Sequence, residues 1–401
     1  MKVLVVIDAH LVRTPDGKVW SPTIYNYDFM ARYLDIFEKV KIVARIEEKD
    51  NHDGFPNLCS GKNVEFFGIP EYRGPKEYLA KYFEIQNIAK SCFADVDCGI
   101  FRVPSTVGYK YAKLFRKTKK PFALEVVIDP WDFAAPGNLQ SILRPAIRVL
   151  WTKDLKKLCK QANGVSYVTK EALQQRYPSK ARLNGKESKQ YFESYYSSVE
   201  LDKDFFEKDR TFVQKKYIDI IHIANNISNY VKGHKELIMA VSELHKRGID
   251  AKVTFVGDGE KMTEFQELAQ ANDVGDKVKF IGRLASKAEV KKELLKHDLF
   301  VFPSHAEGLP RVVIEAMALG TPCISTNING MPELIERKYL VEVGQTKELA
   351  DKIYELWSDK KELQRVSKRN YQEAKTYEKT ILQKRRNDFY KKLKVLTESQ
   401  S

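Results

Sequence analysis

Residues 299–324 read Leu299-Phe-Val-Phe-Pro-Ser-His-Ala-Glu-Gly-Leu-Pro-Arg-Val-Val-Ile-Glu-Ala-Met-Ala-Leu-Gly-Thr-Pro-Cys-Ile324. The apolar run at its start is typical of a buried strand, and Pro303 ends that strand. Pro310 suits the first turn of a helix, and Gly320 suits the position just after its last turn. The segment therefore predicts a strand, a short loop and a helix.

The loop between this strand and this helix is predicted to bind an anion. In open parallel sheets, ligands bind at the carboxyl ends of the strands. The following helix presents unpaired N–H groups and the positive end of its dipole there. Gly308 allows the backbone to approach a phosphate closely. Glu307 and Glu315 can bracket one ligand, because carboxylates accept hydrogen bonds from the vicinal hydroxyls of sugars and riboses.

Short β-branched runs alternate with amphipathic stretches along the whole chain, and this alternation is typical of parallel sheets with crossover helices. A length of 401 residues favours two domains. We expect an α/β fold of two Rossmann-like, doubly wound domains, 1–205 and 206–377, joined by a charged linker at 202–216. The terminal helix, about 378–401, is expected to pack back on the first domain. The expected strands are 2–7, 40–44, 64–67, 99–102, 122–127, 164–168, 218–224, 252–257, 278–281, 299–303 and 323–326, and the clearest helices are 25–37, 76–92, 143–160, 235–246, 262–271, 287–295 and 310–319.

The composition limits the partners and the compartment. The 68 Lys and Arg residues exceed the 54 Asp and Glu residues, for a net charge of +14, which favours an anionic partner. The sequence has no zinc-finger spacing or ribonucleoprotein motif, so we do not expect nucleic acid as a partner. Five scattered cysteines are typical of reduced thiols in a cytoplasmic protein, and no run approaches the ~20 apolar residues of a membrane span. Any contact with an anionic membrane is expected to be peripheral.

Two glutamates in a specific context give a resemblance to a known family. Glu307 and Glu315, within Glu-Gly-x-Pro and Glu-Ala-Met-Ala-x-Gly-x-Pro, resemble the signature of the family 4 retaining glycosyltransferases. The resemblance covers most of the second half of the chain. It implies the GT-B fold, in which two Rossmann-like domains face each other across a cleft. It also implies a nucleotide diphosphate sugar as the donor substrate, with no cofactor and no metal ion.

The resemblance also implies roles for single residues. Glu307 would lie beside the donor sugar and Lys232 would neutralise the donor diphosphate, so both are candidate catalytic residues. The backbone of Gly308 and Leu309 would lie by the phosphates, and Glu315 would bind the nucleotide ribose. Further candidate donor-binding residues are Gly257, Asn226, Arg283, Leu284 and His305.

The chain departs from the family pattern in two places. The arginine that relatives have five residues before the lysine is Ile227 here, so the diphosphate would have weaker cationic support unless Arg283 compensates. The histidine that relatives have at the end of a middle strand of the first domain is also missing. Glu125 and Asp129 occupy the matching stretch.

The acceptor side of the site is less defined by the sequence. Asp129, Glu125 and Trp131 are candidates to hold acceptor hydroxyls or to stack on a sugar, and His10 is a candidate contact. The polar stretch 8–20 after the first strand is expected to be an acceptor-side loop. An equally ordinary alternative is that Asp129 caps a turn beside a core Trp131. His10 also has an ordinary alternative as a core residue at a strand end.

These observations favour a glycosyltransferase that moves a sugar to a glycan or polyprenyl-linked acceptor, with retention, in bacterial surface polysaccharide biosynthesis. Two alternatives remain open. A sugar-nucleotide epimerase shares this architecture and needs no acceptor. A non-catalytic glycosyltransferase partner subunit is the other, because the family's arginine and histidine are missing.

Overall fold

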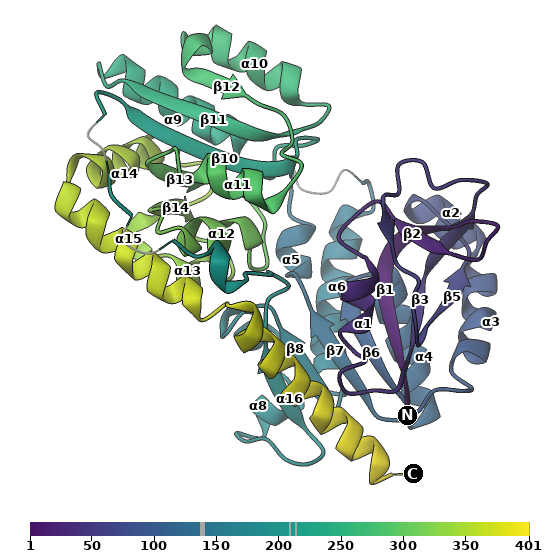
Figure 1. The fold of residues 1–401 in the computed structure, drawn as a ribbon. Coiled ribbons are helices and arrows are strands. Elements are labelled where there is room, and N and C mark those ends of the chain that lie inside the picture. Colours follow the sequence, from purple (N-terminus) through teal and green to yellow (C-terminus); the bar gives the residue numbers. More distant parts are fainter. Residues whose placement is uncertain (137–140, 208–209, 213–214, 401) are drawn as a thin grey trace.

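A computed structural model describes residues 1–136, 141–207, 210–212 and 215–400 of the chain. It has two lobes, each built on a parallel sheet with helices on both faces (Figure 1). The parallel strands of the first lobe run in the order β5-β3-β1-β6-β7-β8-β9, and those of the second lobe run β12-β11-β10-β13-β14-β15. In each lobe the first strand lies inside the sheet and the order reverses around it. The doubly wound α/β fold is therefore confirmed.

The elements of the first lobe follow the alternation of the sequence. Its strands are β1 (Lys2–Arg13), β2 (Val19–Ser21), β3 (Lys39–Glu48), β4 (Asn57–Leu58), β5 (Val64–Ile69), β6 (Cys98–Val103), β7 (Phe122–Val126), β8 (Gly164–Tyr167) and β9 (Phe192–Tyr195). Its helices are α1 (Tyr27–Ala31), α2 (Gly74–Ala80), α3 (Tyr82–Cys92), α4 (Thr106–Phe115), α5 (Pro130–Phe133), α6 (Arg144–Cys159), α7 (Ala172–Arg176) and α8 (Lys180–Leu183), with 3-10 turns η1 (Arg116–Thr118) and η2 (Lys203–Phe205).

The second lobe repeats the scheme and continues into three long helices. Its strands are β10 (Ile218–Asn226), β11 (Ala251–Asp258), β12 (Val278–Phe280), β13 (Leu299–Phe302), β14 (Cys323–Thr326) and β15 (Leu340–Val341). The helices are α9 (His234–Lys246), α10 (Met262–Ala271), α11 (Lys287–Leu294), α12 (Arg311–Ala318), α13 (Met331–Leu334), α14 (Thr346–Ser358), α15 (Lys360–Lys375) and α16 (Lys379–Glu398), with 3-10 turns η3 (Gly275–Lys277) and η4 (Arg337–Tyr339).

The first strand is longer than the sequence indicates. The polar stretch expected to form a loop continues β1 as far as Arg13, and its end pairs with β2. Leu11 and Val12 are buried there, while Asp8 forms an ion pair with Arg45 of β3. The expectation of a long loop directly after residue 7 is therefore wrong, because polar side chains on this strand have partners on the neighbouring strand and loops.

Two expected helices of the first lobe are interrupted. The expected helix 25–37 is helical only over α1, and the chain continues in turns that place Tyr33 and Phe37 under α16. The expected helix 76–92 is two helices, α2 and α3, which meet at Lys81. The side chain of Lys81 donates a hydrogen bond to the carbonyl of Glu71, 2.5 Å away, and so holds the junction.

The chain crosses between the lobes twice. The first crossing follows η2, where the amide of Glu207 already donates to the carbonyl of Ala318 in the second lobe. The second crossing connects α15 to α16, and α16 lies against β9, β6 and β8 of the first lobe (Figure 1). The amide of Lys379 donates to the carbonyl of Leu201, so the two crossings run side by side.

Two buried histidines lie together in the core of the second lobe. His222 on β10 and His234 at the start of α9 have ring centroids 4.5 Å apart and pack against Phe255. Burial lowers the pKa of His222 to about 4 and that of His234 to about 2. Both rings therefore stay neutral in the folded chain at pH values where the unfolded chain binds protons.

We expect the second lobe to lose stability as the pH falls from about 6.5 towards 4. The unfolded histidines take up protons in this range and the folded ones do not, so each ring lowers the free energy of unfolding by about 3 kcal/mol at pH 4. His234→Phe should keep the aromatic packing and flatten this slope, as measured by urea unfolding at a series of pH values. The exposed His245 of α9, changed to Gln, is the control. If His234→Phe left the pH dependence of the free energy of unfolding unchanged, buried His234 would not be its cause.

Candidate active site

The loop between β13 and α12 lies where the second lobe meets the first (Figure 1). Helix α12 begins at Arg311, and Pro310 lies immediately before it in an extended conformation rather than inside the first turn. The helix ends at Ala318, and Gly320 adopts the left-handed conformation (φ 64°) that ends the helix as expected. The predicted strand, loop and helix are therefore present.

The start of α12 has free hydrogen-bond donors. Within the described parts of the chain, the amides of Leu309, Arg311 and Val312 donate no hydrogen bond. Pro310 between them has no amide hydrogen to donate. Unpaired amides and the positive end of the helix dipole together favour an anionic group at this position.

Lys232 and Glu307 form an ion pair beside these amides. The Lys232 ammonium lies 2.5 Å from Oε1 of Glu307, and the Ser304 hydroxyl donates to the same oxygen over 3.1 Å. The Asn329 side chain donates to the Glu307 carbonyl over 2.7 Å. The two candidate catalytic side chains, which are 75 residues apart in the sequence, are thus brought into contact.

Glu315 provides the second acid, and it differs from Glu307 in having no partner. It lies one turn inside α12, is largely buried, and forms no hydrogen bond or ion pair within the described residues. Burial raises the pKa of Glu315, and the nearby positive charges of Arg311 and Lys287 oppose that rise. A largely desolvated carboxylate with free oxygens is suited to accept hydrogen bonds from hydroxyl groups.

The ends of β10 and β11 lie next to this loop. Asn226 is exposed at the end of β10, and Ile227 after it is fully buried. Gly257 has φ 141°, and a Cβ atom there would lie 1.9 Å from the carbonyl oxygen of Ala224. Gly257 is thus required by close strand packing, and the residue at the position of the family's arginine is part of the core.

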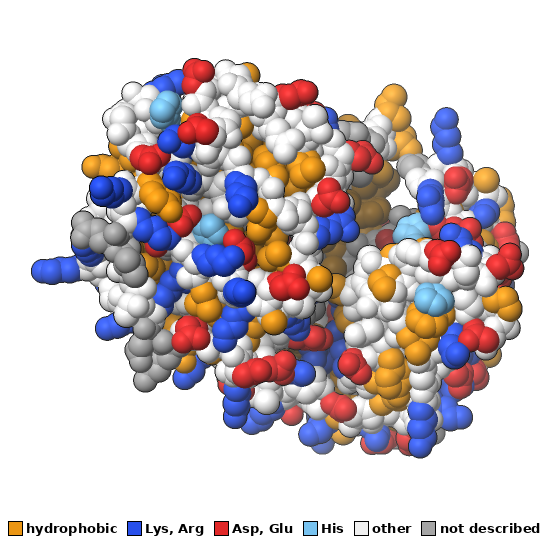
Figure 2. Space-filling model, turned by 45° about the horizontal axis from the view of Figure 1, so that its top comes forward, with side chains coloured by type: hydrophobic (Ala, Val, Ile, Leu, Met, Phe, Trp, Pro, Cys, Tyr) orange, Lys and Arg blue, Asp and Glu red, His pale blue; other side chains and the backbone are white. Residues whose placement is uncertain are grey.

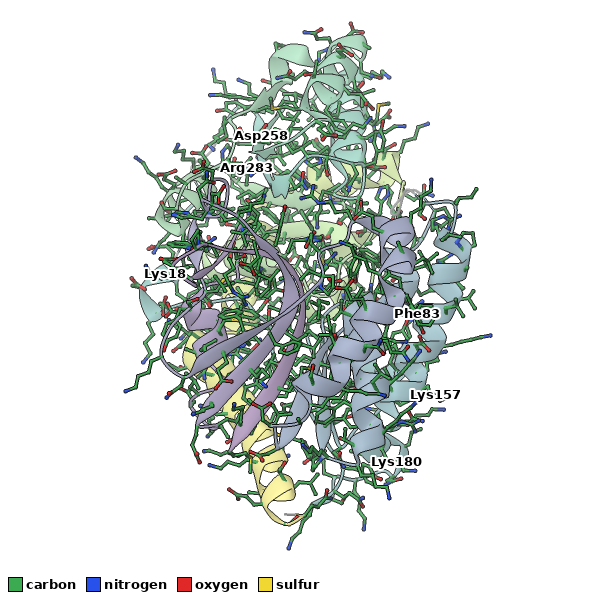
Figure 3. The ribbon with its side chains drawn as sticks, turned by 90° about the vertical axis from the view of Figure 1, so that its right-hand side faces the viewer. Lys18, Phe83, Lys157, Lys180, Asp258 and Arg283 are labelled. Carbon is green, nitrogen blue, oxygen red and sulfur yellow. The ribbon has the colours of Figure 1, made fainter. Side chains whose placement is uncertain are left out.

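The remaining donor candidates have different environments. Arg283 is exposed and forms no ion pair within the described residues, and Figure 3 shows it beside Asp258 at the carboxyl ends of β11 and β12. Leu284 follows it and is partly buried. His305 is directed towards α9, with its Nε2 2.9 Å from Oε1 of Glu236. Arg283 is therefore the freer cation, whereas His305 already has a carboxylate neighbour.

Two glycines make room for the first lobe. A Cβ atom on Gly308 would lie 2.4 Å from the carbonyl oxygen of Val127, at the end of β7. A Cβ atom on Gly330 would lie 2.8 Å from a side-chain carbon of Thr169, and its amide donates to the Gly308 carbonyl. The small size of Gly308 thus serves contact between the lobes, a role that the sequence did not predict.

Glu333 of α13 forms a second contact between the lobes, close to Gly330. Its carboxylate accepts hydrogen bonds from the amides of Lys170, Glu171 and Ala172, at 2.6, 3.0 and 2.7 Å. These amides belong to the start of α7 in the first lobe. The side chain of Lys170 also reaches Glu373 over 2.6 Å. No local sequence signal marks Glu333, because its partners lie more than 160 residues earlier.

Asp129 is not open to an acceptor. Its carboxylate is fully buried, caps α5 by accepting from the Trp131 amide, and is held by Arg176 and Tyr177. Trp131 remains 37% exposed, and the guanidinium of Arg148 lies 3.9 Å from its ring centroid. The expectation that Asp129 holds acceptor hydroxyls is wrong, because three groups of the protein already satisfy it.

Glu125 is held by charged and hydroxyl groups of the protein, and its contact with an acceptor stays a prediction. It is 2% exposed, and its oxygens accept hydrogen bonds from Arg102, Arg32 and three tyrosine hydroxyls. Burial opposes ionisation, yet Arg102 and Arg32 hold the pKa of Glu125 at about 2. The cluster ties β7 to α1, to the segment after β9 and to α16. The tyrosines are Tyr33, Tyr196 and Tyr390.

His10, the last candidate contact on the acceptor side, lies beside a carboxylate. Nδ1 of His10 lies 2.5 Å from Oε1 of Glu71, and the His10 side chain is 41% exposed. Among the residues that the structure describes, no three His, Cys, Asp or Glu side chains come together in a way that could hold a metal ion. Nor does any helix in these described ranges have the length and apolar character to span a membrane.

The sequence of this chain is similar to those of known glycosyltransferases and capsule proteins. Residues 204–373 match the family described as Glycosyl transferases group 1. Protein CapJ of Staphylococcus aureus is 31% identical over 316 residues, which are 79% of this chain and 76% of CapJ. The capsular polysaccharide biosynthesis glycosyltransferase CapM of the same species is 27% identical over 194 residues, which are 43% of this chain and 47% of CapM.

A solved structure supports the fold. The chain superimposes on Anabaena HepE, determined in complex with UDP and glucose, with a TM-score of 0.64 and 15% identity. The superposition covers 97% of this chain and 98% of HepE. Two lobes of parallel sheet face each other in the GT-B arrangement, and the hollow between them is visible in Figure 2. The chain therefore belongs to the group 1 glycosyl transferases and is a glycosyltransferase with the GT-B fold.

Proposed function

We propose that this glycosyltransferase transfers a sugar from a nucleotide diphosphate sugar to a glycan or lipid-linked saccharide acceptor, with retention of the anomeric configuration. The name of CapM, a capsular polysaccharide enzyme, supports bacterial surface polysaccharide biosynthesis as the setting. The resemblance of the two-glutamate motif to family 4 supports the retaining outcome. HepE, with bound UDP and glucose, supports a nucleotide diphosphate sugar as the donor.

The observation that carries the proposal is the free carboxylate of Glu315. It is largely buried, has no protein partner within the described residues, and lies one turn from the unpaired amides of α12. A nucleoside diphosphate matches both features, since its ribose offers two hydroxyl donors and its diphosphate offers anionic acceptors. The ribose would bind to Glu315 and the diphosphate to the helix start.

The reaction then requires stabilisation of the leaving group. The bond between the anomeric carbon and the diphosphate oxygen breaks, a bond to the acceptor oxygen forms, and the acceptor's hydroxyl proton ends on the released nucleoside diphosphate. Lys232 and the amides at the start of α12 would stabilise the developing negative charge. Glu307, which holds Lys232, would orient the lysine and contact the donor sugar. No metal ion is needed in this scheme.

The resemblance to family 4 implies weaker cationic support than the family pattern gives, because Ile227, which is buried, stands where that pattern has arginine. Arg283 is the cation best placed to compensate, since it is exposed at the strand ends without an ion-pair partner in the described residues. The contacts of Gly308 and Glu333 with the first lobe would help to exclude water during transfer.

A panel of nucleotide diphosphate sugars tests the proposed function directly. We expect one donor class to be hydrolysed slowly by the protein alone and transferred quickly when a saccharide acceptor is added. Proton NMR of the product should show the anomeric configuration of the donor. Inverted product would refute retention, and conversion of the donor to an epimer without acceptor would refute transfer.

Glu315→Gln should weaken nucleoside diphosphate binding. Loss of a charge-assisted pair of hydrogen bonds to the ribose corresponds to about a tenfold to hundredfold rise in Kd. Isothermal titration calorimetry with uridine and guanosine diphosphates measures the change. Glu348→Gln on the exposed face of α14 is the matched control. If both variants bound the nucleoside diphosphates with equal affinity, Glu315 would not contact the ligand.

Lys232→Gln should act on turnover more than on binding. The lysine stabilises charge that grows as the diphosphate leaves, so kcat/KM is expected to fall by about a hundredfold or more. Steady-state kinetics with the best donor measure the effect, and thermal unfolding verifies that the variant is folded. Lys246→Gln at the end of α9 is the control. Full activity of Lys232→Gln would exclude the lysine from catalysis.

A further inference from the structure

Large apolar side chains are exposed on one outer layer of the first lobe. Helices α2, α3, α4 and α6 form this layer. Lys110 of α4 donates hydrogen bonds to Tyr82 and Gln86 of α3, and Lys113 of α4 forms an ion pair with Asp154 of α6. We call this surface the outer helical face. Its exposed apolar side chains are Leu79 (65% exposed), Phe83 (76%), Ile142 (96%), Leu143 (44%), Val149 (41%) and Leu150 (58%).

These apolar side chains are not spread evenly over the face. Leu79 and Phe83 lie at the junction of α2 and α3, and the residues from Ile142 to Leu150 lie just before α6 or in its first two turns. Helices between parallel strands begin at the carboxyl edge of the sheet, which is the edge that faces the cleft. The apolar side chains therefore lie towards the end of the face that is nearer the cleft, and we call them the apolar rim.

Positive charge follows the apolar rim along α6. This helix carries five Lys or Arg residues and one acidic residue, Asp154, which is already paired with Lys113. Lys153, Lys156 and Lys157 are exposed and form no ion pair within the described residues. Phe83, Lys157 and Lys180 follow one another down the same side of the molecule in Figure 3, and Lys18 lies on the opposite side.

We propose that the outer helical face rests on the surface of an anionic lipid bilayer. The apolar rim would enter the region between headgroups and acyl chains, and the lysines of α6 would lie over the negative headgroups. The inference deepens the proposed function and rests on it in one respect, since a lipid-linked acceptor would reach the cleft directly from the bilayer beneath the rim.

The charge of the outer helical face favours an anionic bilayer over a second copy of the chain as its binding partner. Helix α6 has a net positive charge, because five basic residues face one acidic residue in its sequence. A symmetric pair of such faces would bring like charges together, and this opposes self-association. An anionic bilayer instead complements both the apolar rim and the lysines that follow it.

Vesicle flotation with the full chain tests this proposal without donor or acceptor. Vesicles of phosphatidylcholine alone are compared with vesicles that also contain phosphatidylglycerol. We expect binding to the anionic vesicles to be about tenfold or more stronger, and to weaken as the salt concentration rises. Absence of binding to the anionic vesicles would overturn the proposal.

Two sets of variants locate the bound surface. The charge variant changes Lys153, Lys156 and Lys157 to Gln, and its control changes Lys235, Lys246 and Lys347 of the second lobe to Gln. The apolar variant combines Ile142→Ser with Leu150→Ser, and its control combines Val343→Ser with Val395→Ser, both also exposed. Each variant should lose about tenfold or more in vesicle binding, and each control should bind like the unchanged chain.

Two further measurements separate the outcomes. Nucleoside diphosphate binding by calorimetry should be the same in the variants and the unchanged chain, so a failure of the proposed function would appear there and not in flotation. Sedimentation velocity should show one species without vesicles. Equal loss of vesicle binding in variants and controls, or self-association that the variants abolish, would overturn the bilayer as the occupant.

Discussion

The active site depends on backbone amides at the start of α12 that have no acceptor among the described residues of the protein. Strand β13 is fully buried, so it delivers the chain to the sheet edge in one position, and Pro310 removes one donor from the turn that follows. The remaining amides need an anionic or hydroxyl acceptor. Lys232, Glu307 and Glu315 lie around this point on different segments. Because the amides between them favour an anionic group, all three side chains can contact one bound ligand.

The first lobe is held against this point by contacts that tolerate little change. Gly308 and Gly330 leave no space for a side chain at the boundary, and Glu333 binds three successive amides of the opposite lobe. Hydrogen bonds from amides to a carboxylate are among the stronger ones in proteins. The lobes therefore meet here through close backbone contacts, alongside an apolar cluster that includes buried residues of both lobes.

The sequence predicted the second lobe better than the first. In the second lobe, short buried strands and a motif with glutamates at a fixed spacing are local signals, and the structure places Glu307, Lys232 and the start of α12 together. In the first lobe, the environment of Asp129 depends on Arg176, 47 residues away, and that of Glu125 on Tyr390, 265 residues away. Such distant partners leave no periodicity in the sequence. The same reason explains the extension of β1, whose polar side chains are satisfied by other strands and loops.

The two chain crossings between the lobes have a mechanical consequence. They are tied to each other through Leu201 and Lys379, and α16 then anchors the far end of the chain on the first lobe through Phe389 and Tyr390. The two connecting segments are therefore paired with each other at one place between the lobes. A rotation of one lobe about this place would break the contact of Glu333 with the three amides, whereas separation of the lobes would also have to break the pairing of the two connections.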